Sequence, residues 1–232
     1  MTVLRHRSAS LAAFQKRWRA LKGTSYEPAE VLYEIPLVVL LGPRQPRRLF
    51  LVTKQTLLSR IYEETQAFPP HWVIVQRHGL PDQAHVEEVG SISRRLKLPI
   101  CFIGDLAPFD LHVFIRYHDM AKTTVARPSW WGINARWLQL CRRLAGPEQF
   151  DMSVAQDMSP VEREHFAALQ VSAPWLEGAL GAEPWNLLRE GKKVSLEAAS
   201  GVAFYGEGFH RRLVRLLEGR TTSRPSARSR KD

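Results

Sequence analysis

Short apolar runs alternate with amphipathic segments between residues 49 and 117. Apolar runs of four or five residues are typical of strands buried on both faces, whereas apolar positions repeating every three or four residues are typical of helices with one buried face. Three strands are predicted over 49–52, 72–75 and 99–103, and three helices over 56–66, 85–96 and 111–117. Strands separated by helices of this length predict parallel βαβ units, so we expect an α/β fold with a mostly parallel, Rossmann-like sheet flanked by helices.

Outside this segment the pattern is less regular. The apolar run over 35–41 predicts another buried strand. Ser159, Pro160 and Glu162 have the spacing of a helix N-cap, a first-turn proline and a capping-box partner, whereas Trp130 and Trp131 are interpreted as loop residues anchored in the core. Further helices are predicted over 8–21, 135–144 and 192–199.

These elements divide the chain into three parts. Residues 1–48 are expected to hold an N-terminal helix and a strand or linker. Residues 49–219 are expected to form the α/β domain with a helical C-terminal extension. Residues 220–232, rich in Ser and Arg, are expected to be a basic disordered tail.

The charge balance points towards an anionic partner. The net charge is +10 and the isoelectric point about 10.1. The tail holds five basic residues and one acidic residue, which leaves +6 on the rest of the chain; a merely solvated tail is the alternative. The longest apolar run is far shorter than the roughly 20 residues of a membrane span, and no signal peptide is recognisable. Two cysteines cannot form a disulfide framework. We therefore expect a cytoplasmic protein, with nucleoid association open, and no membrane partner.

Polar segments follow each of the three predicted strands, at the edge where parallel sheets gather ligands. They read Thr53-Lys54-Gln55, Gln76-Arg77-His78-Gly79 and Gly104-Asp105-Leu106-Ala107-Pro108-Phe109-Asp110. In this order, with their strands, they resemble the toprim domain of the topoisomerase VI A subunit and of the related meiotic double-strand-break transesterase. The segment Gly191-Lys192-Lys193-Val194-Ser195-Leu196-Glu197 is similar to that family's C-terminal helix. The resemblance runs from about residue 49 to 217.

The resemblance implies a Mg²⁺ site from which ligands have been lost. The family supplies a glutamate after the first strand and an Asp-x-Asp pair after the third. Here Thr53 replaces the glutamate and Ala107 the second aspartate, whereas Asp105 is retained. Asp110 stands where the family has glycine and is the other candidate ligand. Because Mg²⁺ requires several oxygen ligands, we expect weak metal binding by Asp105 and Asp110 at a degenerate site. The alternative role of Asp105 is that of an N-terminal cap or loop carboxylate for the helix that begins near Phe109.

The resemblance also implies a tyrosine nucleophile, carried on a winged-helix domain that precedes toprim. Only about fifty residues precede the first strand here, and their tyrosines, Tyr26 and Tyr33, lack the expected setting. No activating base can be named for either hydroxyl. We therefore expect no strand cleavage by this chain alone, which makes it a pseudoenzyme by resemblance.

Basic residues near the predicted strand ends and in the C-terminal motif are the candidate phosphate contacts. They are Arg44, Arg47, Arg48, Lys54, Arg77, Lys192 and Lys193. Three hypotheses follow, in order of preference. The first is a non-catalytic, DNA-associated toprim-like subunit. The second is a reduced metal-dependent topoisomerase or nuclease subunit whose nucleophile comes from another chain. The third is a protein-interaction scaffold. The expected partners are DNA, a second copy of the chain, and an ATPase B-type or winged-helix subunit.

Overall fold

One mixed sheet organises the computed structural model, which describes residues 38–41, 47–65, 72–76, 80–119, 127–200 and 208–219. Within these residues the strand order is β1-β3-β2-β4-β5. Four strands run parallel and β1 lies antiparallel to β3 at one edge, so the predicted α/β class with a mostly parallel sheet is confirmed. The strands are β1 (Val38–Leu41), β2 (Arg48–Val52), β3 (Trp72–Gln76), β4 (Ile100–Ile103) and β5 (Ser129–Trp130).

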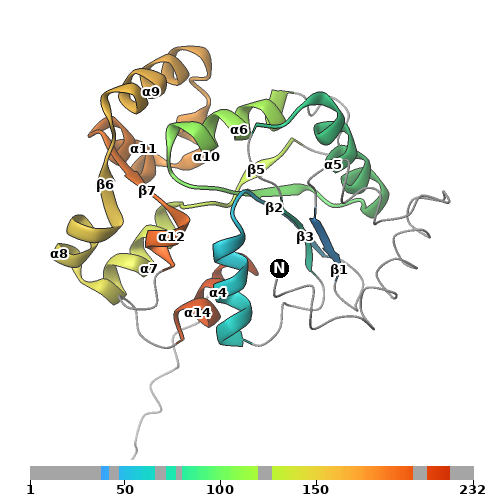
Figure 1. Ribbon diagram of the computed structural model, residues 1–232, viewed down its shortest axis with the longest axis horizontal. Coiled ribbons are helices and arrows are strands. Elements are labelled where there is room, and N and C mark those ends of the chain that lie inside the picture. The colour runs from blue at the N-terminus through green and yellow to red at the C-terminus, as the bar shows by residue number, and fades with distance from the viewer. Residues whose placement is uncertain are drawn as a thin grey trace, which may run out of the picture.

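Helices cover both faces of this sheet (Figure 1). The crossover helices are α4 (Gln55–Thr65), α5 (Gln83–Leu96) and α6 (Pro108–Asp119). Figure 1 shows α5 and α6 above the sheet, and α4 with α14 (Phe209–Leu217) below it. The described side chains of β3 and all those of β4 are buried, as expected for strands packed between two helical layers. This arrangement is compatible with a Rossmann-like fold.

A helical lobe follows β5 and packs at the carboxyl ends of the parallel strands. Its strands β6 (Ala155–Asp157) and β7 (Lys192–Val194) pair antiparallel. Backbone hydrogen bonds in both directions between Leu106 and Val194 tie β7 to the loop that follows β4. The helices of the lobe are α7 (Ala135–Ala145), α8 (Pro147–Gln149), a π-helical turn (Phe150–Val154), α9 (Pro160–Ser172), α10 (Leu176–Leu180), α11 (Ala182–Arg189) and α12 (Leu196–Ala199).

Most elements predicted from the apolar pattern are present. The strand predicted over 35–41 is β1, and the capping box of Ser159 and Glu162 at the start of α9 is formed. Two predictions were wrong. Trp130 belongs to a fourth parallel strand, paired with β4, instead of a loop. Residues 192–194 form β7 instead of a helix, because they pair with β6, and α12 begins only after Ser195, whose hydroxyl accepts the Ala198 N–H at 3.0 Å.

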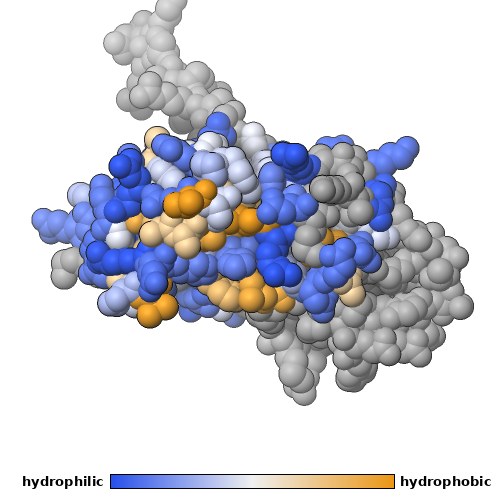
Figure 2. All heavy atoms as spheres, turned by 90° about the horizontal axis from the view of Figure 1, so that it is seen from above, coloured by the Kyte–Doolittle hydropathy of each residue, from blue (hydrophilic) through white to orange (hydrophobic). Residues whose placement is uncertain are grey.

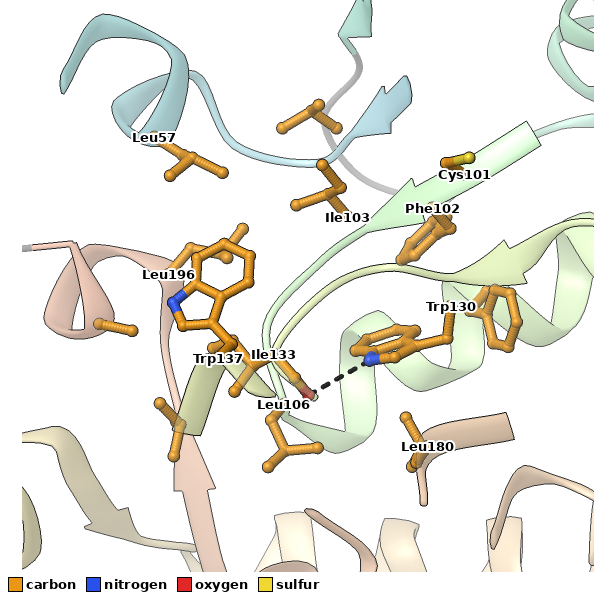
Figure 3. Packing of buried hydrophobic residues seen from close by; sticks show 14 of the residues in the cluster. Leu57, Cys101, Phe102, Ile103, Leu106, Trp130, Ile133, Trp137, Leu180 and Leu196 are labelled. Atoms are coloured by element: carbon orange, nitrogen blue, oxygen red, sulfur yellow. Dashed lines mark hydrogen bonds between the residues drawn. The ribbon is translucent and has the colours of Figure 1, made fainter. Parts of the chain in front are cut away.

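A continuous apolar core joins the lobe to the sheet (Figure 3). The fully buried Trp137 of α7 belongs to this core with Leu57 of α4 and Leu196 of α12, and Leu196 lies beside its indole in this view. Trp130 packs on Phe102 with ring centroids 5.5 Å apart, and its indole N–H donates to the Ile133 carbonyl at 3.3 Å. The lobe therefore shares the core of the sheet. In the described part of the chain, no helix is long and apolar enough to cross a membrane. The helix predicted over 8–21 and the tail from residue 220 lie outside the described residues.

Candidate functional site

The strand order reverses between β2 and β4, which is the point where open α/β sheets bind ligands. From β2 the chain crosses through α4 to β3 on one side, and α5 then carries it back past β2 to β4 on the other side. The loops that leave β2 and β4 therefore meet at one crevice. The Thr53 N–H donates to the Ile103 carbonyl at 3.1 Å and holds the two loops together. The sequence-predicted edge of the sheet is thus where Lys54 and Asp105 come together.

A cavity of about 360 Å³ opens at this crevice. Thr53, Lys54, Asp105 and Asp110 line it from the sheet, while Glu162 and Lys193 line it from the lobe. The cavity is therefore polar and contains charges of both signs, and Glu162 and Lys193, which complete it, lie more than forty positions beyond α6 in the chain. Any ligand of this cavity would contact both the sheet and the lobe.

The ammonium group of Lys54 lies between two carboxylates. Lys54 Nζ is 2.5 Å from Asp105 Oδ2 and 2.8 Å from Glu197 Oε2. Burial opposes the charging of this amine, but hydrogen bonds to Asp105 and Glu197 together outweigh it and raise the pKa of Lys54. Lys54 therefore stays a cation and is the counter-ion of Asp105, which is only 7% exposed.

Both carboxylate oxygens of Asp105 have hydrogen-bond partners. Oδ2 accepts from Lys54, and Oδ1 accepts the N–H of Leu196, the first residue of α12, at 2.7 Å. Asp105 therefore satisfies a donor at the start of α12 as a loop carboxylate. It does not cap the helix that begins near Phe109, because its carboxylate is directed towards Lys54 and the lobe. Desolvation by burial raises the pKa of Asp105, although Lys54 and the Leu196 N–H act against it.

Asp110 is directed inwards to the backbone of its own loop. Its Oδ2 accepts the Asp105 N–H at 2.5 Å and the Thr53 hydroxyl at 3.1 Å. It is 5% exposed, and burial together with the nearby charge of Asp105 raises the pKa of Asp110 to about 6. Asp110 thus ties the loop after β4 to the end of β2.

The raised pKa of Asp110 predicts a stability gain for Asp110→Asn. A carboxyl whose folded-state pKa lies above its unfolded value stabilises the fold below the unfolded pKa, and this contribution is lost as the pH rises through about 6. Asparagine keeps an oxygen acceptor for Thr53 and Asp105 but carries no charge. We expect Asp110→Asn to raise the free energy of unfolding by roughly 1–3 kcal/mol at pH 8 and by roughly half as much at pH 5, where the unfolded carboxyl is already ionised while the folded one is mostly protonated.

Urea unfolding of both proteins at the two pH values measures this difference. Asp119→Asn, which removes an exposed carboxylate from the same helix, is the matched control and should change little at either pH. A loss of stability in Asp110→Asn at pH 8 would contradict the expectation that the buried charge of Asp110 lowers the free energy of unfolding there.

These residues do not fit a Mg²⁺ site. Magnesium requires a near-octahedral set of oxygen ligands. The ammonium group of Lys54 lies beside Asp105, where a metal ion would have to bind. Asp110 Oδ2 already accepts two hydrogen bonds. Among the residues that the structure describes, no group of three or more His, Cys, Asp or Glu side chains is placed to hold a metal ion.

Two glycines allow the loops after β4 and β5 to approach closely. A Cβ on Gly132 would lie 2.6 Å from the Gly104 carbonyl oxygen, and a Cβ on Gly104 would lie 2.7 Å from the Phe102 ring and 3.0 Å from Asp110 Oδ2. Side chains at these positions would force backbone apart. The position of Asp105 therefore depends on glycine at both 104 and 132.

The basic residues predicted as phosphate contacts do not form one group. Lys193 lines the cavity with its ammonium 2.7 Å from Glu162, and Lys192 is 3.0 Å from the exposed Asp157. Arg47 and Arg48 lie at the amino-terminal edge of the parallel strands, opposite the cavity, because Arg48 begins β2. Arg44 and Arg77 lie outside the described residues.

Two acidic residues of the site were not among the sequence-based candidates. Glu197 and Glu162 lie 143 and 31 positions from the lysines with which they pair. The first is part of the C-terminal motif but has no local signal of a role in the site. The second was interpreted only as a capping-box residue, which it also is, because it accepts the Ser159 N–H at 2.8 Å.

Comparisons with known proteins identify no relative, so any functional assignment depends on the geometry of the site. No family model matches the chain, and no curated protein is significantly similar to it.

Proposed function

We propose that the chain is a toprim-like, DNA-associated subunit that does not itself cleave DNA. The proposal rests on the resemblance of its strand-end motifs and on the Lys54–Asp105 pair, with its 2.5 Å separation. A lysine that neutralises the one retained family aspartate leaves the cavity without the metal chemistry that strand cleavage needs. The net charge of +10 supports a nucleic acid partner.

Two properties of the site favour this reading over an enzyme. The buried carboxylates take part in structural contacts, since Asp105 binds Lys54 and the Leu196 N–H while Asp110 binds Thr53 and the Asp105 N–H. The contact of Asp105 with Leu196 joins the sheet to the lobe, and the contacts of Asp110 hold the loops after β2 and β4 together. Asp105 and Asp110, which could otherwise hold a metal, thus stabilise the α/β fold. This is expected of a protein in which the fold serves binding and not catalysis.

The surface gives less support to a pure scaffold. Figure 2, which looks onto the upper side of the molecule, shows hydrophobic side chains in small groups among hydrophilic ones. The large hydrophobic residues that are exposed in the described chain are few and spread over several elements: Leu80, Phe109, Val161 and Val171. Extended apolar patches mark protein interfaces, and these residues do not form one.

Fluorescence anisotropy with a labelled DNA duplex tests the proposal. We expect binding that does not change when EDTA is added. With roughly four phosphate contacts, the affinity should fall about 100-fold between about 50 and 200 mM salt, because bound counterions are released on association. Absent or salt-insensitive binding would refute the proposal and favour the scaffold.

A plasmid assay separates the proposal from the enzymatic alternative. Supercoiled plasmid incubated with the protein and Mg²⁺ or Mn²⁺ should stay intact, because no cleaving group is supplied. Cleavage that disappears in Asp105→Ala would instead show a metal-dependent nuclease or topoisomerase subunit.

A further inference from the structure

Helix α14 has one buried and one strongly basic face. Phe209, His210, Leu213 and Leu217 are buried against the rest of the protein, mainly α4. Arg211, Arg212 and Arg215 are exposed, and the helix contains no acidic residue. Figure 1 shows α14 beside the lower part of α4, on the outside of the molecule.

The helix is held firmly at both ends. At its start, Glu64 Oε2 accepts the backbone N–H of His210 at 2.9 Å and the ring Nδ1–H at 2.7 Å. At its end, Arg48 Nη2 donates to the Glu218 carbonyl at 3.2 Å while its guanidinium lies 4.7 Å from the Trp131 ring centre. The exposed arginines therefore project from a fixed backbone, which lowers the entropy that a partner must remove on binding.

The three arginines differ from the lysines of the site in their lack of counter-ions. Lys54, Lys192 and Lys193 each form an ion pair with a carboxylate. Arg211, Arg212 and Arg215 make no ion pair with any residue that the structure describes. Glu64 and Glu218 lie at the two ends of the helix, but within the described residues neither forms an ion pair with any of these arginines, so the exposed face keeps a local excess of positive charge that attracts an extended anion.

Their spacing fits a row of phosphates. Arg211 and Arg215 are four residues apart, so they lie on one side of the helix about 6 Å apart along its axis, and Arg212 is adjacent to Arg215 at a spacing of three. Guanidinium groups bind phosphate oxygens through two parallel hydrogen bonds. The apolar face of α14 is already buried, so the helix is not available to insert into a membrane.

We infer that the exposed face of α14, with Arg211, Arg212 and Arg215, binds the phosphate backbone of double-stranded DNA. This inference rests on the proposed function and locates its DNA contact. The surface is separate from the cavity: Glu64, which holds α14, lies about 14 Å along α4 from the end beside Lys54. DNA bound there needs neither the cavity nor a metal ion.

Titration of the labelled duplex with a triple variant, Arg211→Gln, Arg212→Gln and Arg215→Gln, tests the inference. We expect the affinity to fall about 10- to 100-fold at low salt and the slope of log affinity against log salt to decrease by about three, one for each lost phosphate contact. The matched control is Arg94→Gln, Arg116→Gln and Arg189→Gln, which removes the same charge from exposed positions on α5, α6 and α11. It should retain the slope and lose less than about threefold in affinity.

The outcomes separate the surface from the proposed function. If the wild type binds DNA and the α14 variant binds with the same affinity and slope, the surface is wrong and the proposed function stands. If the wild type binds no DNA but binds polyglutamate through these arginines, both are wrong and an acidic protein is the partner. An Arg→Lys triple variant keeps the charge but not the paired hydrogen bonds, so it should keep most of the salt slope and lose part of the affinity. Thermal unfolding of every variant confirms that it is folded.

Discussion

Replacing Trp137 with alanine is expected to lower the free energy of unfolding by about 3–5 kcal/mol. Trp137 of α7 is fully buried in the core that also holds Leu57 of α4 and Leu196 of α12, and Figure 3 shows Leu196 beside its indole. Removing the indole leaves a large cavity at the junction of sheet and lobe, which cannot collapse without moving α12. Because the first N–H of α12, that of Leu196, donates to the Asp105 carboxylate, the change should loosen the site as well. Urea unfolding followed by far-UV circular dichroism measures the loss.

Trp137→Phe is the matched control. The indole N–H of Trp137 is buried and has no hydrogen-bond partner among the described residues. Phenylalanine fills most of the same volume and removes this unsatisfied donor, so we expect a loss below about 1.5 kcal/mol. If Trp137→Ala cost no more than this control, the junction between sheet and lobe would not depend on the indole.

Replacing Lys54 with methionine is expected to lower the free energy of unfolding by roughly 2–3 kcal/mol at pH 8. Removing one partner of a buried ion pair costs about 3–5 kcal/mol, because the other charge remains buried and unpaired. The Lys54 side chain is 31% exposed, so solvent screening reduces the cost. Asp105 would then keep the Leu196 N–H but would have no cationic partner among the described residues, and the acidic Asp110 and Glu197 would remain nearby.

The pH dependence and a double variant identify the cause of this loss. Without the ammonium the pKa of Asp105 rises further, so the deficit of Lys54→Met should shrink at pH 5, where more of the carboxyl is protonated. Adding Asp105→Asn should recover much of the stability at pH 8, because it removes the unpaired charge. Equal stability of Lys54→Met and the wild type at pH 8 would mean that the ion pair contributes nothing to the fold.

The sheet and its crossovers were predictable because their signal is local. Runs such as 72–75 and 100–103 are apolar throughout, and the helices between them repeat their apolar positions with helical spacing, so burial on two faces or one is recorded in neighbouring residues. The same holds for the start of α9, where Ser159 and Glu162 satisfy each other's backbone within one turn. The elements that sequence reasoning missed are those without such a local pattern. β5 has two residues, and β7 exists only through its pairing with β6.

The candidate site divides in the same way. Parallel strands end at one edge, so the meeting of Thr53, Lys54 and Asp105 followed from the order of the elements alone. The partners of these residues did not. That Lys54 binds Asp105 and Glu197, and that Asp110 turns inwards to Thr53, depends on contacts between residues 50 to 143 positions apart. Sequence determined the α/β frame and the excess of positive charge, because both are sums over local composition. Only the tertiary structure decided which charges are neutralised within the fold and which, as on α14, form no ion pair with the described residues. Pairing between residues far apart in the chain leaves no periodic pattern in the sequence.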